Sequence, residues 1–410
     1  MGCVIPTHLH ITIIKLTLNP HTMNLHQLWL ITRYSFTEIW RNKTFRVAFM
    51  VLIPLLIAYQ VSFQSDMFNI PVEYTLVLSS FIPTQNAYMF NLLLVFPLAT
   101  MGFWVHKQKK YNTLEALLVH PQGNDTYSTG FILGIIIAFM IMGSISLALA
   151  GLINLFASPT SFRPLIYLFY LVTLILPTIV FIVGITSFLA ARCFKNGTVT
   201  TFFMLVYLSV DILFLSTLYH GLFDPLGILL PYTFSDFTGI ADLPGFLLHR
   251  TTFLLLGIGF ITLAISGLPR IPNKINGRQR AACSGILALF VGLLAGFITY
   301  NHHEQVERRH ALYESVYEKH DSPNKINIIA HDIRFTYQQK EARVESRVSL
   351  YNPTGITLSE IILYLNPSLE VTSIQENLSP VPFTREAQAI VISRPVSPGD
   401  SLALDIQYQG

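Results

Sequence analysis

Seven long apolar runs, separated by short polar segments, dominate the first 300 residues of the chain. A helix of about 20 residues, rising 1.5 Å per residue, crosses the hydrocarbon core of a bilayer. Each run is close to this length or exceeds it. We therefore expect seven membrane-spanning helices, at residues 46–63, 87–105, 129–156, 165–190, 198–218, 251–268 and 281–300.

An amphipathic pattern precedes the first run. Apolar positions recur at helical spacing at Leu25, Leu28, Trp29, Thr32, Phe36, Ile39 and Trp40, and polar side chains occupy the other face. This pattern predicts an interfacial helix that lies in the headgroup layer. Residues 1–22 hold an apolar patch too short to span and lack a small-residue cleavage site, so we interpret them as a start-site extension before Met23.

Beyond residue 326 the period of the pattern changes from helical to two. Inward positions Ala342, Val344, Ser346, Val348 and Leu350 alternate with polar neighbours. Similar alternation returns at 361–365 and 402–408, with turn signals at Asn352-Pro353, Asn366-Pro367 and Pro398-Gly399. Short antiparallel strands of this spacing predict a β-sandwich. The expected fold class is thus an α-helical integral membrane domain followed by an all-β sandwich, joined by a polar helical stalk at 301–325.

Composition agrees with this fold class. Of 410 residues, 52% are hydrophobic and 12% are charged, whereas soluble chains are about a quarter charged. The net charge is only +3, and no basic cluster has interleaved aromatic residues, so nucleic acid is excluded as a partner. The three cysteines form no disulfide or metal-binding pattern. The bilayer itself is the first expected partner.

Basic residues concentrate in alternate loops, which predicts the orientation of the chain. Loops assigned to the inside carry Arg33, Arg41, Lys43, Arg46, Lys107, Lys109, Lys110, Arg192, Lys195, Arg270, Lys274, Arg278 and Arg280. Those assigned to the outside carry only Arg163 and Arg250. Because short loops rich in Lys and Arg stay in the cytoplasm, we expect a cytoplasmic N-terminus and an extracytoplasmic β-domain.

The loop at 107–124, KQKKYNTLEALLVHPQGN, lies between the second and third runs. Leu114, Leu117 and Leu118 fall at i, i+3 and i+4 and give a short helix an apolar stripe beside Glu115. The stretch KKYNTLEALLVHP resembles the basic–Gly–Thr–Leu–Glu–x–Leu–Leu–x–x–Pro stretch of type-2 ABC transporter permeases, with Asn112 in place of the glycine. The resemblance implies a coupling helix that docks on an ATPase subunit through Lys109, Lys110, Thr113, Leu114, Glu115, Leu117, Leu118 and Pro121. From the residues alone, a solvated surface turn is the alternative.

The resemblance to type-2 permeases, over residues 23–300, implies further features. In that family an N-terminal elbow helix precedes six spans, so the seventh span is an addition here. No G-x-x-x-x-G-K-[ST] loop occurs in the chain, so ATP and Mg²⁺ would belong to a separate ATPase subunit and this chain would hold no cofactor. The other implied partner is a second permease copy or a sister permease, in a bacterial cytoplasmic membrane.

The segment at 220–249 is apolar but broken by Pro225, Pro231, Pro244 and several glycines. We interpret it as short helices tucked back into the outer leaflet, where backbone at bilayer depth must be satisfied by protein. The resembled family has a re-entrant lid at this place, and the stretch LLPYTFSDFTGI is similar to its Pro–aromatic–Ser pattern. An ordinary extracellular loop is the alternative.

Residues 326–410 resemble the N-terminal domain of zinc aminopeptidases of the aminopeptidase-N type, through ARVESRVSLYNPTGITLSEIILYLNPSLEVTSI and SPGDSLALDIQYQG. In those enzymes the catalytic zinc domain follows, and some bacterial polypeptides fuse the two families. Here His303-Glu304-Gln305-Val306-Glu307 begins like H-E-x-x-H but lacks the second histidine. We therefore expect no catalytic residue, no metal site and no enzyme activity, and we expect the DNA beyond codon 410 to encode the missing domain.

Asp211 is the one carboxylate within the expected spans. An ionisable group at that depth marks either a transport pathway or a paired polar network. The resemblance to type-2 permeases, rather than Asp211, implies that the chain is a permease subunit of an ATP-driven, exporter-type ABC transporter. The alternative is a membrane anchor for an extracytoplasmic aminopeptidase-like module whose catalytic part is absent.

Overall fold

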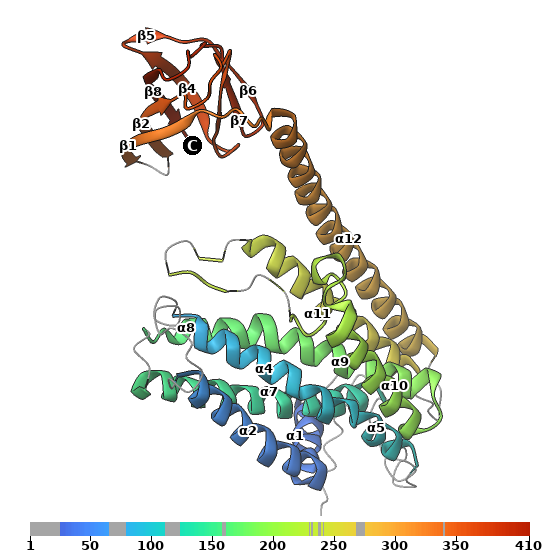
Figure 1. Ribbon diagram of the computed structural model, residues 1–410. Helices are drawn as coiled ribbons and strands as arrows, with labels where there is room; N and C mark the ends of the chain where they lie inside the picture. The colour runs from blue at the N-terminus through green and yellow to red at the C-terminus, as the bar shows by residue number, and fades with distance from the viewer. Residues whose placement is uncertain are drawn as a thin grey trace, which may run out of the picture. The chain divides into compact units, whose positions relative to one another are not determined.

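Helices occupy the chain as far as His320 and strands follow from Asn327 (Figure 1). The computed structural model describes residues 25–64, 79–110, 124–157, 161–228, 230, 233–236, 239–240, 242–267, 275–338 and 341–410. The chain divides into two units, Met1–Asn301 and His302–Gly410. Each unit is described by itself.

The described residues of the first unit are mostly helical. Its α-helices are α1 (Leu25–Arg41), α2 (Lys43–Gln64), α4 (Phe81–Ala99), α5 (Met101–Lys110), α7 (Asn124–Ala157), α8 (Pro164–Tyr170), α9 (Leu176–Phe188), α10 (Gly197–Val210), α11 (Leu243–Gly267) and the start of α12 (Ile275–His320). Three π-helical segments, η2 (Leu171–Ile175), η3 (Leu189–Cys193) and η4 (Asp211–Leu215), and a 3₁₀ turn, η5 (Leu218–Gly221), complete it.

Seven helical stretches of the described residues are long and apolar enough to cross a membrane. They are Lys43–Ser62, Phe81–Phe103, Thr126–Phe156, Pro164–Cys193, Gly197–Leu215, Leu243–Gly267 and Gln279–His320. They confirm the fold class expected of the membrane part and are compatible with a multi-pass membrane protein. The sixth helix begins eight residues before the predicted start, because the Asp242 carboxylate accepts the Gly245 amide hydrogen and Pro244 is tolerated in a first turn.

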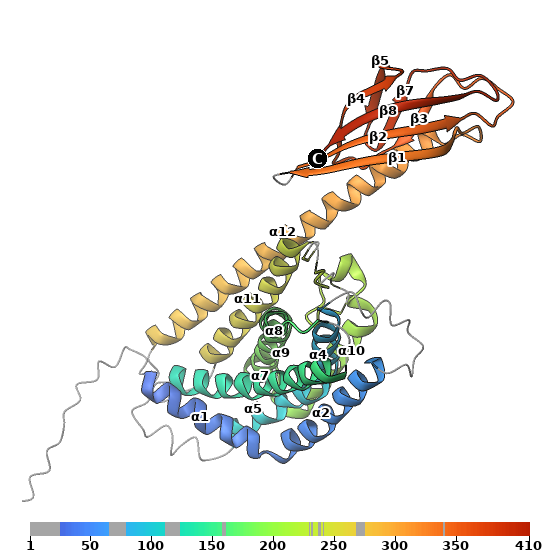
Figure 2. The ribbon, with the colours of Figure 1, turned by 90° about the vertical axis from the view of Figure 1, so that its left-hand side faces the viewer.

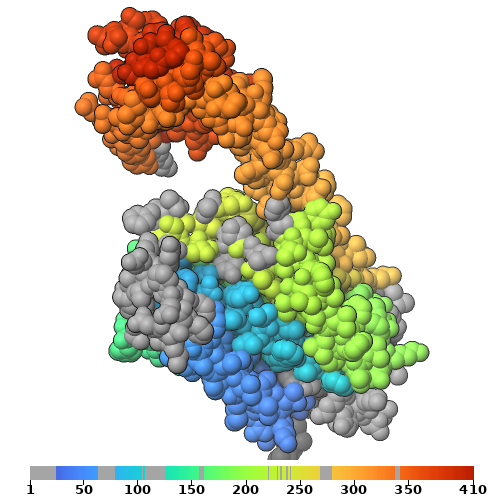
Figure 3. Space-filling view, viewed as in Figure 1, coloured from blue at the N-terminus to red at the C-terminus, as the bar shows by residue number. Residues whose placement is uncertain are grey.

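Apolar side chains cover the outside of the first unit as well as its interior. Exposed examples are Val47, Met50, Val51 and Leu55 on α2, Phe202, Phe203 and Val206 on α10, and Ile286, Leu287, Phe290 and Leu293 on α12. Figure 3 shows α2, in blue, and α4, in cyan, lying open on one face. A surface this apolar is typical of a protein whose solvent is lipid.

The amphipathic helix α1 packs along the first part of α7 through small side chains (Figure 2). Thr32, Ser35 and Ile39 are its buried residues, whereas Trp29 is 59% exposed. Methyl groups at Gly130 and Gly134 of α7 would lie 2.7 Å from Ile31 and Ser35 respectively. The helix therefore uses a stripe beside its apolar one to contact protein, and the Gly-x-x-x-Gly spacing of α7 admits its backbone.

The second unit holds two antiparallel sheets. Strands β1 (Asn327–Gln338), β2 (Glu341–Tyr351), β8 (Ser401–Gln409), β4 (Glu370–Glu376) and β5 (Ser379–Pro380) form one sheet in that order. Strands β3 (Ile361–Tyr364), β7 (Ala389–Ile392) and β6 (Phe383–Glu386) form the other. Both sheets contribute to one core, which includes Val348, Leu350, Ile361, Ile374, Ile390, Ile392, Leu404 and Ile406. This two-sheet core is the expected β-sandwich.

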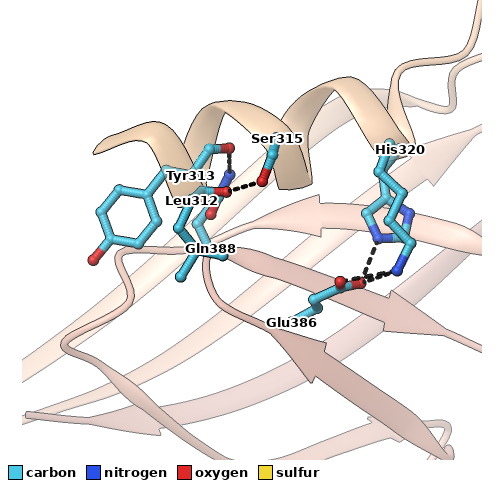
Figure 4. A network of polar contacts seen from close by, with 7 residues as sticks. Leu312, Tyr313, Ser315, His320, Glu386 and Gln388 are labelled. Atoms are coloured by element: carbon cyan, nitrogen blue, oxygen red, sulfur yellow. Dashed lines mark hydrogen bonds and ion pairs between the residues drawn. The ribbon is translucent and has the colours of Figure 1, made fainter. Parts of the chain in front are cut away.

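The last turns of α12 belong to the second unit and contact the end of β6 and the turn that follows it. Gln388 donates to the Tyr313 carbonyl at 2.5 Å, and the Lys319 ammonium lies 2.8 Å from the Glu386 carboxylate (Figure 4). His320 Nε2 lies 3.1 Å from the same carboxylate. Hydrogen bonds from Lys319 and His320 lower the pKa of Glu386 below its ordinary value of 4.5. The end of the helix is thus bound to the sandwich by charge-assisted contacts.

Candidate functional site

A buried polar network lies at one end of the first unit, where α11 meets α9 and the segment after η5. Arg250, on α11, is 1% exposed. Its Nε donates to the Thr173 carbonyl at 3.2 Å, and its Nη2 donates to the carbonyls of Leu174 and Pro225 at 3.1 Å. The guanidinium group thus connects α11 with two other backbone segments, residues 173–174 and Pro225, through fixed, diverging donors.

Proline explains why backbone acceptors are free at this place. Pro177 has no amide hydrogen, so the carbonyl of Thr173, four residues earlier, lacks its usual helical donor. The π-helical segment η2 ends just before this proline. Arg250 Nε, which donates to the Thr173 carbonyl, supplies the missing donor. The break in the helix is therefore matched by a side chain from another element.

The second part of the network is an irregular segment, 224–227, that is buried in protein. Asp224 is fully buried and accepts the amide hydrogens of Leu226 at 2.8 Å and Gly227 at 2.9 Å, together with that of Ile228. Gly227 has a φ of +73°, a conformation that favours glycine. The Asp224 carboxylate therefore folds a tight turn that Arg250 then holds through Pro225.

Asn91 ties the same turn to α4. Its Nδ2 donates to the Leu226 carbonyl at 3.0 Å and lies 3.2 Å from the Thr178 hydroxyl. Thr178 Oγ1 also lies 2.8 Å from the Pro225 carbonyl. Four elements thus meet at one polar cluster, which we call the Arg250 network and define as Asn91, Thr178, Asp224, Pro225 and Arg250.

Asp211, the pathway candidate of the sequence, lies beside this network. It begins η4 and is fully buried. It interacts electrostatically with Asp224 and with Arg250. The structure therefore brings Asp211 together with two charged residues that the sequence pattern had not connected to it. Such a group of one arginine and two carboxylates can hold a proton or a structural charge balance within an apolar bundle.

Of the predicted coupling residues, only two lie in a described element. Lys109 and Lys110 are the last residues of α5, whereas Thr113, Leu114, Glu115, Leu117, Leu118 and Pro121 lie outside the described residues. Nothing here tests their assignment. The structure does show how α5 and α7, the two helices that flank the loop, contact neighbouring helices.

Those two helices are each held by a close contact. On α5, His106 Nε2 lies 3.2 Å from the Thr200 hydroxyl of α10, and a methyl at Gly102 would lie 3.0 Å from Thr200. On α7, Gly130 and Gly134 receive α1. The predicted coupling loop therefore joins a helix fixed to α10 with a helix fixed to α1.

Sequence reasoning missed most of the Arg250 network. Arg250 was assigned to an outside loop, because an arginine beside a proline- and glycine-rich segment resembles a loop charge. It lies instead within α11, seven residues after Leu243, where the helix begins. Pro177 inside an apolar run was the available signal, since it requires a donor from elsewhere.

No metal site emerges from the part of the chain that the structure describes, in which no three His, Cys, Asp or Glu side chains are grouped to hold an ion. His303, Glu304 and Glu307, which begin like a zinc motif, lie on α12. Arg308 pairs with Glu304 one turn away at 3.2 Å. This arrangement is an i, i+4 pair on a helix surface.

Comparison with known proteins gives little. No model of a protein family matches the chain, and no curated protein matches it. Among solved structures, the chain is similar to a mutant M1 zinc metallopeptidase from Deinococcus radiodurans bound to a Tyr-Ser-Ala substrate. The identity is 22%, the match covers 21% of this chain and 20% of that chain, and the TM-score is 0.19. The chain thus spans about a fifth of that peptidase.

Proposed function

We propose that this chain is the membrane-spanning permease subunit of an ATP-driven, exporter-type ABC transporter. The observation that carries the proposal is the stretch KKYNTLEALLVHP, which lies in the sequence between two helices long and apolar enough to span a membrane and belongs to the set of loops rich in Lys and Arg. An amphipathic helix at the start of the described chain, α1, also supports it. On this proposal the N-terminus is cytoplasmic, the second unit is extracytoplasmic, and the membrane is the bacterial cytoplasmic membrane.

The contacts around the coupling loop suggest how force would enter the unit. Closure of ATPase subunits would displace residues 111–123. Because α5 is fixed to α10 through His106 and Gly102, and α7 is fixed to α1 through Gly130 and Gly134, displacement of the loop would move α10 and α1 with it. Two discrete arrangements of packed helices are the usual means of such transmission.

The partners follow from what the chain would need. A separate ATPase subunit would bind ATP and Mg²⁺, and a second copy or a sister permease would complete the pathway. The chain itself would hydrolyse neither ATP nor peptides, because it carries neither a phosphate-binding loop nor an H-E-x-x-H motif. The transported substrate is not specified by any of these features.

A second candidate function is a membrane anchor for an extracytoplasmic aminopeptidase-like module. The resemblance of residues 326–410 to an aminopeptidase domain favours it, together with the charge-assisted attachment of α12 to the sandwich at Glu386. In this case the spans would hold the module at the membrane, and no ATPase would bind residues 107–124.

Co-purification with the ATPase separates the two candidates. The wild-type chain should retain an ATPase subunit when it is extracted from native membranes. Leu117→Asp should insert normally but lose the ATPase, because a charge at an apolar contact is costly unless it is paired. Gln122→Asp, which adds the same charge at a polar position of the same loop, should retain it. A wild-type chain without ATPase, or equal retention by Leu117→Asp, contradicts the permease proposal.

A further inference from the structure

Strand β1 of the second unit is a long edge strand with an apolar face that this unit leaves uncovered. It spans 12 residues and, among the described strands, pairs only with β2. Ile333, Phe335 and Tyr337 are 57%, 61% and 65% exposed. Long, flat, apolar edge strands with unpaired backbone groups tend to associate with another strand, and most folds protect them with charge, proline or a bulge.

The exposed side chains of β1 lie on the face that the rest of the sheet buries. Phe335 is opposite Val344 and Ile333 is opposite Ser346, and both of these β2 residues are buried. The core between the two sheets includes no β1 residue among its buried members. The strand therefore extends the apolar side of the sheet beyond the reach of the second sheet, as the outer position of β1 in Figure 2 shows.

The other face of β1 carries charges that alternate in sign from strand to strand. Asp332 is opposite Arg347, which lies 3.5 Å from Asp405 of β8. Arg334 pairs with Glu345 at 3.7 Å. Toward the free edge, the first row thus reads negative, positive, negative, and the second row reads negative, positive. A strand that extends the sheet should present a positive charge beside Asp332 and a negative charge beside Arg334.

We propose that the free edge of β1 binds β1 of a second copy of this chain, antiparallel, about a two-fold axis at Ile333. In this register Asp332 lies opposite Arg334 of the second copy, and Arg334 lies opposite its Asp332. On the apolar face Ile333 meets its own equivalent, and Phe335 meets His331 of the second copy. Two sheets join into one, with both charge rows continued.

Charge pairing favours this register over the adjacent registers of the two strands. Moving the axis by one residue toward either end places Asp332 opposite Asp332 or Arg334 opposite Arg334. A parallel arrangement in register also sets like charges side by side. Only the axis at Ile333 pairs both charges with their opposites, and it leaves the apolar side chains on one face. The proposal is independent of the transporter function, since an anchor could also be dimeric.

The first test is thiol cross-linking of the full chain in membranes. Cys3, Cys193 and Cys283 are replaced by serine, and Ile333→Cys is introduced, because directly opposite Cβ atoms lie about 4.5–5.5 Å apart in an antiparallel pair. Mild oxidation or a short bis-maleimide should give a cross-linked dimer. Leu378→Cys, at an 87% exposed position between β4 and β5, controls for collision and should remain monomeric. Equal cross-linking at both positions, or none at residue 333, overturns the proposal.

Charge reversal gives the second test. Asp332→Arg alone and Arg334→Asp alone each place like charges at both symmetric contacts, so the cross-linked fraction should fall about tenfold in either homodimer. Co-expression of the two variants under different tags restores opposite charges, so cross-linking between the tags should recover. Each variant carries the same internal change alone and together, which separates association from misfolding. The register is overturned if the cross-linked fraction of the single variants equals that of the parent chain, or if cross-linking between the tags does not recover on co-expression.

Discussion

At the residue scale, Arg250 links a proline-broken helix and an irregular buried turn with a single guanidinium group. Without it, the carbonyl oxygens of Thr173, Leu174 and Pro225 lose a hydrogen-bond donor at a buried site, where water cannot replace it. Arg250→Met should therefore lower the free energy of unfolding of the first unit by about 3 kcal/mol. Thermal denaturation in detergent measures this loss.

Two further variants sharpen this prediction. Arg250→Lys should recover little of the stability, because an ammonium group cannot reach diverging carbonyls as the planar guanidinium group does. Arg163→Met is the matched control, since Arg163 is half exposed and its pair with Asp236, at 3.2 Å, contributes little. If Arg250→Met unfolds at the same temperature as Arg163→Met, the network has no stabilising role.

Glu386 supplies a pH-dependent prediction. The hydrogen bonds from Lys319 and His320 lower the pKa of Glu386 in the folded chain, so the ionised carboxylate stabilises the attachment of α12 above the ordinary value of 4.5. This stabilisation is lost as the pH falls through the lowered, folded-state pKa. Glu386→Gln should remove that part of the pH dependence. The thermal transition of the β-sheet circular dichroism signal, compared between the two chains from pH 7 to pH 3, tests it.

Residues differ in how far the sequence could predict them. Asn352-Pro353 signalled a turn, and buried Asn352 indeed donates to the carbonyls of Ile356 and Val396 at 2.9 Å. Arg250 could not be predicted, because its role depends on carbonyls that other elements bring to it. The six coupling residues from Thr113 to Pro121 remain predictions, since they lie outside the described part of the chain.

At the element scale, α9 and α11 approach each other through glycine. A methyl group at Gly257 would lie 2.7 Å from both the Cα and the amide nitrogen of Phe181. Backbone atoms cannot move aside as a flexible side chain can. Gly257→Ala should therefore force the helices apart and cost about 1–3 kcal/mol.

The control for this prediction is another glycine of the membrane unit. A methyl at Gly296 of α12 would meet Thr252 at 3.4 Å, an ordinary van der Waals contact. Gly296→Ala should therefore leave the melting temperature in detergent close to that of the wild-type chain. A Gly257→Ala chain as stable as Gly296→Ala would show that the crossing can relax.

The sequence predicted an element when the length or period of its apolar pattern was sufficient to define it. It did not predict features that depend on which other elements pack beside it. A run of some 20 apolar residues has few alternatives to a spanning helix, and period two within 342–350 fixed the inward face of β2. The exposed apolar face of β1 was not foreseen, because alternation does not reveal which strand lies at an edge. The π segments were not foreseen either, since one extra residue leaves hydropathy unchanged.

At the scale of the whole molecule, an odd number of spanning helices would place the two ends of the chain on opposite sides of the membrane. Charge asymmetry predicts which side each end occupies. A phosphatase reporter that is active only when exported should be active after His320 and silent after Lys110. The opposite pattern contradicts the orientation, and activity at both positions contradicts the number of spans between them.

The overall architecture was therefore within reach of the sequence, because hydropathy and period two separate a membrane unit from a sandwich. Partners and transport were not, since the predicted docking role of residues 111–123 depends on a second protein. The arrangement of Asp211 with Asp224 and Arg250 lies between these cases. Each charge is visible in the sequence, but their meeting depends on the path of the segment between η4 and α11.

The π-helical segments change the angular phase of the spans that contain them. An extra residue per π turn rotates everything beyond it by about 100° relative to an uninterrupted helix. The span Pro164–Cys193 contains two such shifts, and Gly197–Leu215 ends in one. Deletion of a single residue from η2, such as Val172, would leave a span long enough to cross the bilayer. It would nevertheless turn Thr178 away from Asn91. The length of such a span and the direction in which its side chains point are therefore set independently.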